Sequence, residues 1–311
     1  MKTISKILVN VEEHHDSTQA IAKAVWLAER SGAAIELFCC CFNLSVRNGY
    51  LFDREAGLHA QHAYLRQVED RLLNTASSLQ NQGLTVGVDV AWDRHHCEGV
   101  LRKAQRYGPD LLIHQIGVHS RLGHYWMAHQ DWQLLRDCTI PVLLVKAHQW
   151  GRVPRVAACV DPFHECDAPA ELDRAILNHA CLLARLADGR LHVVHSYHAL
   201  PQAAIFDEHV VTDYAALQKK VARKHAEALE KMLDEHGYVD AENVHQLEGE
   251  THLMLPAFAA QHRIDVMVMG SIARGFVDRM LLGSTIERIF DEMDCDVLAV
   301  KPAASVVAQP G

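Results

Sequence analysis

Small and hydroxyl-bearing residues gather near the carboxyl end of the chain, in a pattern that could bind a phosphate. The segment GSIARGFVDRMLLGST spans residues 270–285 and directly follows the apolar run Val266–Met269. Gly270 ends that run, and Gly283 and Ser284 open the next predicted helix. Backbone amides at the start of a helix point outward, and the helix dipole favours an anion there. The lysine of a P-loop is missing, so the segment is not a P-loop. These residues could bind a phosphate, or they could only form turns and cap a helix.

Other groups in the same half of the chain could complete such a site. Asp161 follows the apolar run Val156–Val160, and its carboxylate could bind a ribose hydroxyl, a base amine or a metal ion. Arg274 and Arg279 lie between the glycines, where they could reach a phosphate or face solvent.

Histidine is the second unusual feature, with 22 copies in the chain. In the first half, His119 and His124 stand where the second half has its glycine segment, and His96 and Cys97 follow another predicted strand. Neutral imidazole and thiolate groups suit zinc. His96, His119 and His124 are therefore candidate ligands of a transition metal. Their spacing forms no compact motif, so surface histidines in a region that has lost its site are an equally good interpretation.

Composition excludes several functional classes. The 311 residues include 49% hydrophobic and 22% charged side chains, which is typical of a globular protein, and the net charge is −9. An acidic chain argues against sustained nucleic-acid binding, and no apolar run is long enough to span a membrane. The amino-terminal residues do not resemble a signal peptide, so the cytoplasm is expected. The three adjacent cysteines, Cys39–Cys41, lie in an apolar run and are expected to be buried.

The chain consists of two copies of one unit. Asp110-Leu-Leu-Ile-His precedes Pro141-Val-Leu-Leu-Val-Lys, and Asp265-Val-Met-Val-Met precedes Asp296-Val-Leu-Ala-Val-Lys at the same spacing. Such internal similarity indicates a repeat architecture. We expect an amino-terminal domain over residues 1–148, a linker over 149–154, a carboxyl-terminal domain over 155–303 and a flexible tail over 304–311, with Gly151 and Pro154 marking the linker.

Each copy alternates short apolar strands with helices. Predicted strands include 86–90, 111–114 and 142–145, and long helices are predicted over 58–82 and 214–237, with long loops over 43–57 and 198–213. Strands that are apolar throughout and alternate with helices indicate a parallel sheet covered on both faces. The sequence therefore predicts an α/β protein with two tandem, open, parallel five-stranded sheets. Ligands of such sheets bind at the carboxyl ends of the strands, where the strand order reverses.

These features together resemble the universal stress protein family, and specifically its tandem two-domain type. The resemblance rests on the repeated unit, on Val160-Asp161, and on the glycine pattern before DCDVLAVKP, and it covers residues 1–303. It implies the adenine-nucleotide alpha-hydrolase-like fold and ATP binding in the second domain, with Mg²⁺ accompanying the nucleotide. The residues that the resemblance assigns to nucleotide binding are Asp161, Met269, Gly270, Ser271, Gly275, Gly283, Ser284 and Thr285. The sequence departs from the family pattern at Ala273, where a glycine is usual, and Gly275 could compensate.

The first copy lacks these features. Asp131 and Trp132 stand where the second copy has Gly283 and Ser284, and Glu12 replaces Asp161. We therefore expect no ATP in the first domain, but zinc instead if the histidines converge. The resemblance implies a stress-response regulator that binds an adenine nucleotide and forms a homodimer of four domains. The alternatives are a slow ATPase that uses the same site, and a scaffold or metal-binding dimer that binds no nucleotide.

Overall fold

The computed structural model describes residues 3–49, 53–116, 129–163, 171–198, 214–237, 243–271, 289–290 and 292–302 of the chain. The chain divides into two compact units, Met1–Gln149 and Trp150–Gly311. The predicted domains 1–148 and 155–303 fall one in each unit.

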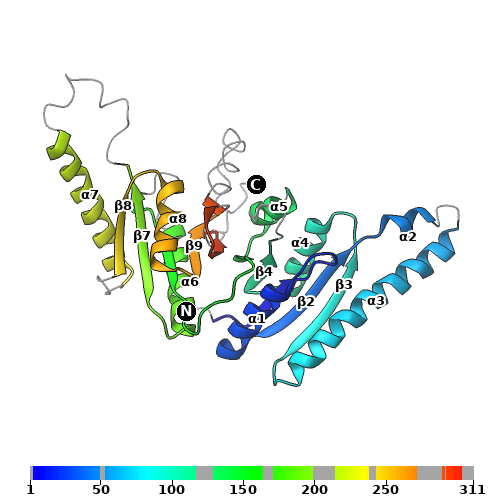
Figure 1. The fold of residues 1–311 in the computed structure, drawn as a ribbon. Helices are drawn as coiled ribbons and strands as arrows, with labels where there is room; N and C mark the ends of the chain where they lie inside the picture. The colour runs from blue at the N-terminus through cyan, green and yellow to red at the C-terminus, as the bar shows by residue number, and fades with distance from the viewer. Residues whose placement is uncertain are drawn as a thin grey trace, which may run out of the picture. The chain divides into compact units, whose positions relative to one another are not determined.

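In the first unit, strands alternate with helices along the chain, and two helices in succession follow the second strand (Figure 1). The elements are β1 (Lys6–Asn10), α1 (Thr18–Ser31), β2 (Ala34–Cys41), α2 (Leu44–Gly49), α3 (Arg54–Gln80), β3 (Val86–Trp92), α4 (His96–Tyr107), β4 (Leu111–Gln115), α5 (His129–Asp137) and β5 (Val142–Val145).

The second unit repeats this alternation. Its described elements are β6 (Val156–Cys159), α6 (Glu171–Leu186), β7 (Leu191–Tyr197), α7 (Tyr214–Glu235), β8 (Val244–Glu248), α8 (Thr251–His262), β9 (Val266–Gly270) and β10 (Asp296–Val300).

Both units have the same sheet topology. The strand order is β3-β2-β1-β4-β5 in the first unit and β8-β7-β6-β9-β10 in the second. Each of these neighbouring pairs within a unit is parallel. The prediction of an α/β fold with parallel sheets and helices on both faces is confirmed. The order reverses between β1 and β4, and again between β6 and β9, so the carboxyl ends of these strands are where a ligand is expected.

Burial follows the apolar patterns of the sequence. Strands β4, β5 and β10 are buried along their whole length, which requires cover on both faces. Helix α1 buries Ala20, Ala24, Leu27 and Ala28, a helical spacing that makes one apolar stripe. The helix ends at Gly32, whose φ of 74° suits a residue without a side chain. Cys39, Cys40 and Cys41 are 1–2% exposed, as their apolar run predicted.

The segment after β2 corrects one prediction. Residues 43–57 were expected to form a loop, but α2 occupies Leu44–Gly49 and α3 begins at Arg54. The side chain of Asn43 accepts hydrogen bonds from the amides of Ser45 and Val46, and Asp53 accepts one from Ala56. These two side chains satisfy the amides at the helix starts. The predicted loop was wrong because the caps were not recognised.

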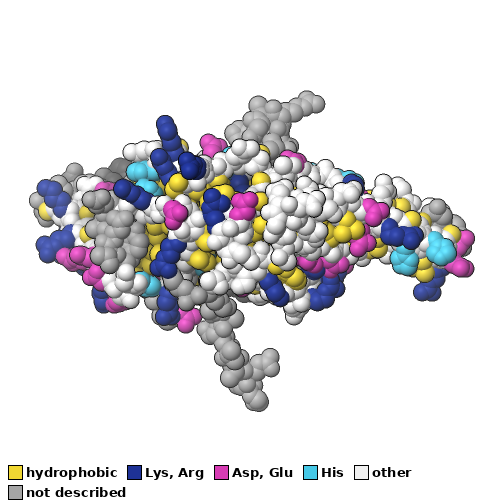
Figure 2. Space-filling model, turned by 90° about the horizontal axis from the view of Figure 1, so that it is seen from below, with side chains coloured by type: hydrophobic (Ala, Val, Ile, Leu, Met, Phe, Trp, Pro, Cys, Tyr) yellow, Lys and Arg dark blue, Asp and Glu magenta, His cyan; other side chains and the backbone are white. Residues whose placement is uncertain are grey.

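Surface charges are mixed. On the face seen in Figure 2, lysine and arginine side chains are interspersed with aspartate and glutamate rather than gathered into one basic patch. Among the described helices, none combines the length and the apolar character that a membrane crossing requires.

Candidate functional site

In the second unit, an acidic and a hydroxyl residue meet at the carboxyl edge of the sheet. Strands β6 and β9 are neighbours, and their ladder pairs Ala158 with Val268. Asp161 and Ser271 each lie three residues beyond this pair. Asp161 is half-buried, and Ser271 is buried with 8% of its surface exposed. Both residues therefore lie at the point where the strand order reverses, which is where parallel sheets bind ligands.

Hydrogen bonds fix the turn that carries Asp161. Its backbone amide donates to the carboxylate of Asp173 over 2.9 Å, and its own carboxylate accepts from the amide of Phe163 over 3.2 Å. Asp173 lies in the first turn of α6 and is 4% exposed. The start of α6 thus holds the Asp161 turn in place against the end of β6.

Gly270 has a packing role as well as a position at this edge. A Cβ atom at Gly270 would come within 2.5 Å of Cδ2 of Leu172, a side chain of α6. The next residue, Ser271, donates its amide to the carbonyl of Val300 over 2.7 Å, so the end of β9 stays paired with β10. Met269 is 8% exposed. The glycine therefore allows α6 to approach the end of β9 closely.

A group of aromatic and imidazole rings that was not predicted from the sequence lies next to the Asp161 turn. Nδ1 of His195 is 3.1 Å from the carbonyl oxygen of Val160, and its Nε2 is 2.8 Å from Nδ1 of His225. A carbonyl oxygen can only accept, so Nδ1 of His195 carries the proton and Nε2 accepts from His225. Burial lowers the pKa of His195, which favours this neutral form.

The outer members of this group present ring surface. The ring of His225 is stacked on Tyr197 with centroids 4.5 Å apart, and Phe163 meets His225 edge-on at 4.5 Å. Phe163 is 43% exposed. We refer to Phe163, His195, Tyr197 and His225 as the ring group. It offers a partly exposed apolar surface two residues from Asp161.

The remaining predicted nucleotide-binding residues lie outside the described part of the chain. They are Gly275, Gly283, Ser284 and Thr285, and Ala273 lies outside it too. The structure thus brings Asp161, Met269, Gly270 and Ser271 to one edge.

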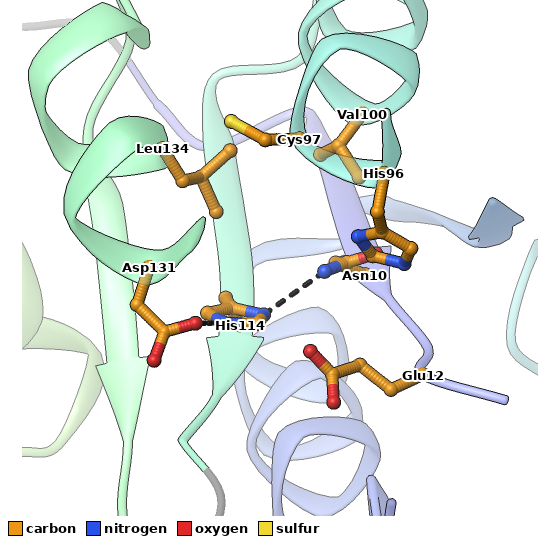
Figure 3. A pocket seen from close by; sticks show the side chains of 8 residues that line it. All are labelled: Asn10, Glu12, His96, Cys97, Val100, His114, Asp131 and Leu134. Atoms are coloured by element: carbon orange, nitrogen blue, oxygen red, sulfur yellow. Dashed lines mark hydrogen bonds and ion pairs between the residues drawn. The ribbon is translucent and has the colours of Figure 1, made fainter. Parts of the chain in front are cut away.

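The first unit fills the equivalent position with a buried polar chain (Figure 3). The β1–β4 ladder pairs Asn10 with His114, and Nδ2 of Asn10 is 2.9 Å from Nδ1 of His114. Nε2 of His114 is 2.9 Å from Oδ1 of Asp131, which lies in the first turn of α5. Asn10, His114 and Asp131 are 1%, 2% and 6% exposed. A side-chain network therefore occupies the place where the second unit presents Asp161 and Ser271.

The carboxylates around His114 shift its pKa upward in the absence of a metal ion. Burial opposes protonation, but the hydrogen bond and charge of Asp131, with the charge of Glu12, outweigh it and raise the pKa of His114. Oδ1 of Asn10 is buried and has no hydrogen-bond partner among the described residues. This oxygen can accept a hydrogen bond from a protonated His114 if the amide turns.

The polar chain lines a small pocket together with Glu12, His96, Cys97, Val100 and Leu134 (Figure 3). Oε2 of Glu12 is 2.6 Å from Nδ1 of His15, and its side chain is 21% exposed. His96 is the first residue of α4, and burial lowers its pKa, so its imidazole is neutral near pH 7. The free space at the centre of this pocket is about the size of one water molecule. Sites for drug-sized ligands are many times larger, so a nucleotide does not fit here.

The donors in this pocket match a metal ion. Glu12, His114 and Asp131 each offer one ligand atom, and these atoms lie within 4.8 Å of one another. Two carboxylates and an imidazole suit zinc and related ions. Of the predicted ligands, His96 lines the pocket, whereas His119 and His124 lie outside the described residues. The carboxylates of Glu12 and Asp131 were not predicted as ligands, because only imidazoles and thiols were expected to bind the metal.

Comparisons with known proteins agree with this architecture. A model described as "Universal stress protein family" matches residues 3–146 and again 158–301. The chain is 24% identical over 306 residues to universal stress protein E of Photorhabdus laumondii, covering 97% of this chain and 96% of that protein. It is 23% identical over 313 residues to universal stress protein E of Escherichia coli, covering 97% and 95%.

Solved structures show the same fold. A putative universal stress protein from Pseudomonas aeruginosa superposes with a TM-score of 0.72 at 25% identity, covering 96% of this chain and 94% of that one. A universal stress protein from Archaeoglobus fulgidus gives a TM-score of 0.69 at 17% identity, covering 96% and 98%.

Proposed function

Because the chain belongs to the universal stress protein family, in its tandem form related to universal stress protein E, we propose that its second unit binds ATP or a related adenine nucleotide. One observation carries this proposal: Asp161, Gly270 and Ser271 lie together where the strand order of the second sheet reverses. In the first unit, the corresponding position is closed by the His114–Asp131 pair.

The ring group supports an adenine base as the part of the ligand nearest Asp161. Exposed Phe163 and the stacked pair Tyr197 and His225 offer ring surface, and Asp161 offers a carboxylate to a ribose hydroxyl or an exocyclic amine. Aromatic surface with a few polar groups is the usual lining of a small-molecule site. The ring group is built from the β6–α6 turn, β7 and α7 of one unit, so it comes pre-formed with the fold.

The phosphates would be bound by the segment that follows β9. Ser271 begins this segment, and Gly283, Ser284 and Thr285 provide helix-start amides and hydroxyls in the sequence. Mg²⁺ would accompany a triphosphate and neutralise part of its charge. Gly275 would give the backbone freedom that Ala273 lacks.

The first unit would bind a transition metal, such as Zn²⁺, rather than a nucleotide. Glu12, His114 and Asp131 offer three donors, His96 lines the same pocket, and the buried Oδ1 of Asn10 can accept a hydrogen bond from a metal-bound water. His119 and His124 are the further ligands that the sequence suggests.

At the level of the whole protein, we propose a cytoplasmic stress-response regulator that changes conformation or partners when the nucleotide binds. The resemblance suggests a homodimer of four domains, which sedimentation or light scattering would test. The mixed charges on the face seen in Figure 2 favour a small-molecule ligand over nucleic acid. A slow ATPase and a scaffold that binds no nucleotide are the alternatives.

Native mass spectrometry with and without Mg-ATP tests the proposal. We expect one nucleotide per chain in the wild-type protein, weakened roughly tenfold or more in Asp161→Asn because a charged hydrogen bond is worth about 1.5–3 kcal/mol. Gly283→Asp would abolish binding by adding a negative charge beside the phosphates.

Glu12→Gln is the matched control, since Glu12 occupies the equivalent place after the first strand of the other unit. It should bind the nucleotide as the wild type does. Phosphate release would then separate a slow ATPase from a binding protein, and no nucleotide at millimolar Mg-ATP would favour the scaffold.

A further inference from the structure

Three histidines of the second unit come together near the amino ends of the strands, whereas Asp161 lies at the carboxyl ends. His192 is the second residue of β7, His245 is the second residue of β8, and His262 is the last residue of α8. All three are half-buried, so they are held by their neighbours but still reachable from solvent. We call this set the imidazole trio.

The nitrogen atoms of the trio are arranged as metal ligands are. One ring nitrogen from each histidine lies within 4.8 Å of the other two. Nδ1 of His192 and Nε2 of His245 are 3.1 Å apart. Two ligands of a tetrahedral zinc ion at about 2.0–2.1 Å from the metal are about 3.3 Å apart. These two nitrogens therefore already have nearly the separation that a shared ion requires.

The fold holds each of the three rings in place. His192 and His245 lie on neighbouring parallel strands, whose ladder pairs Val193 with Val244. The ring of His262 stacks on Phe258 with centroids 4.2 Å apart, and Phe258 also packs against His245 at 4.9 Å. Metal sites depend on such support, because surrounding packing orients the ligands before the ion arrives.

The backbone of His262 is fixed as well. Its carbonyl accepts a hydrogen bond of 2.8 Å from the guanidinium of Arg155. The end of α8 is therefore anchored beside the amino end of β6, while the imidazole of His262 stays among the rings of the trio.

The chemistry of the three ligands indicates the class of metal ion. Neutral imidazole is the form that coordinates a transition metal. No carboxylate belongs to the trio, which favours a borderline ion such as Zn²⁺ over Ca²⁺ or Mg²⁺.

The trio is distant from the site proposed for the nucleotide. His192 and Tyr197 lie on the same strand, five residues apart, which corresponds to about 16 Å along an extended chain. The trio is thus at the amino ends of the strands, and Asp161 and Ser271 are at the carboxyl ends.

We propose that His192, His245 and His262 form a binding site for a divalent transition-metal ion of the zinc class. The three imidazoles provide three ligands, and water takes the remaining position of a tetrahedral ion, as in zinc sites that stay open to solvent. This site needs no nucleotide and is separate from the Glu12 pocket of the first unit.

Zinc titration of the full-length, nucleotide-free protein against a chromophoric chelator tests the site, with native mass spectrometry to count bound ions. In His245→Gln and in His192→Gln, one zinc equivalent should weaken more than about 100-fold, since even residues that only orient a ligand cost 10–100-fold. His179→Gln is the matched control. His179 is also a half-buried histidine of the second unit, but its Nδ1 bonds the Ala175 carbonyl within its own helix. The zinc affinity of the His179→Gln variant should stay within twofold of that of the wild type.

Two further variants keep the test decisive. If His245→Gln folds poorly by circular dichroism, His262→Gln removes a ligand from the end of a helix instead of from a strand. Glu12→Gln disables the pocket of the first unit, and the zinc equivalent of the trio should survive it. The proposal is overturned if trio variants bind as much zinc as the wild type at equal affinity, or if Glu12→Gln alone removes all bound zinc.

Discussion

The carboxyl edges of the two sheets have the same topology and different chemistry. In the first unit, Asn10, His114 and Asp131 form a buried polar chain across the point where the strand order reverses. In the second unit, Asp161 and Ser271 flank that point, and the partly exposed ring group lies beside it. The same fold therefore carries a small polar pocket in one copy and a partly exposed ring surface in the other.

The two sites differ in side chains on sheets of the same strand order. A histidine on β4 and an aspartate at the start of α5 suffice to close the first site, because they bond each other inside the sheet edge. The corresponding strand of the second unit, β9, ends in Met269 and Gly270. Since the two sheets have the same strand order, the two units differ here in the side chains that end β4 and β9.

The largest effect should come from breaking the polar chain of the first unit. Asp131→Ala removes one member of a buried pair, and we expect the free energy of unfolding to fall by about 3 kcal/mol. Chemical denaturation would measure it. Asp137→Ala, in the same helix but paired with Arg136 at the surface, should cost less than about 1 kcal/mol. Equal losses in both variants would show that the buried pair has no special role.

A smaller effect is expected from filling the space at Gly270. Gly270→Ala places a Cβ against Leu172, and overpacking of this kind costs about 1–2 kcal/mol of stability. Leu172→Ala in the same chain should recover part of this cost, which a double-mutant cycle would detect. If instead nucleotide affinity falls while stability is unchanged, Gly270 serves the ligand rather than the packing of α6.

The departure at Ala273 offers a test that strengthens the second site. If the loop needs a backbone conformation that glycine adopts freely, Ala273→Gly should improve nucleotide binding by about 1 kcal/mol, or roughly fivefold. Isothermal titration with Mg-ATP would measure the change. Val277→Gly, nearby in the same segment but outside the family pattern, is the control. An Ala273→Gly variant with unchanged or weaker affinity would remove this explanation of the departure.

The smallest effect is a difference between His195 and His114 in how their contributions to stability depend on pH. The folded-state pKa of His195 is lowered, so the unfolded chain binds more protons as pH falls through about 6.5. Relative to His195→Gln, the wild type should therefore lose stability between pH 7 and pH 5.

His114 should show the opposite sign because its folded-state pKa is raised. Its contribution is fully present below about pH 6.5 and is lost as pH rises through the raised value. Relative to His114→Gln, measured with a chelator present, the wild type should lose stability on going from pH 6 to higher pH. The same sign for both histidines would contradict the contrast between the units.

Much of the fold could be predicted from the sequence, because buried parallel strands are apolar throughout and the unit is repeated. The strand predicted over 142–145 has these ends in the structure. Helix α3 was expected over 58–82 but spans Arg54–Gln80, since the Asp53 cap starts it earlier. Helix ends depend on individual side-chain hydrogen bonds, which periodicity does not reveal.

The sites were less predictable. Asp161 and Gly270 could be placed at one edge, because each follows a strand in a parallel sheet. The ring group and the imidazole trio could not, since they depend on which residues face each other between strands and on how α7 and α8 pack. His192 and His245 are brought together by the β7–β8 register, whereas His225 and His262 reach these strands from α7 and α8.

Photoaffinity labelling tests the contrast between the units most directly. An azido-adenine nucleotide would be bound to the full-length protein with Mg²⁺, crosslinked by light, and located by peptide mapping. The account predicts label in the second unit, on peptides that carry Phe163 or His225, and competition by unlabelled ATP. Label on the first unit, around Glu12 or His96, would contradict the assignment of the nucleotide to the second unit.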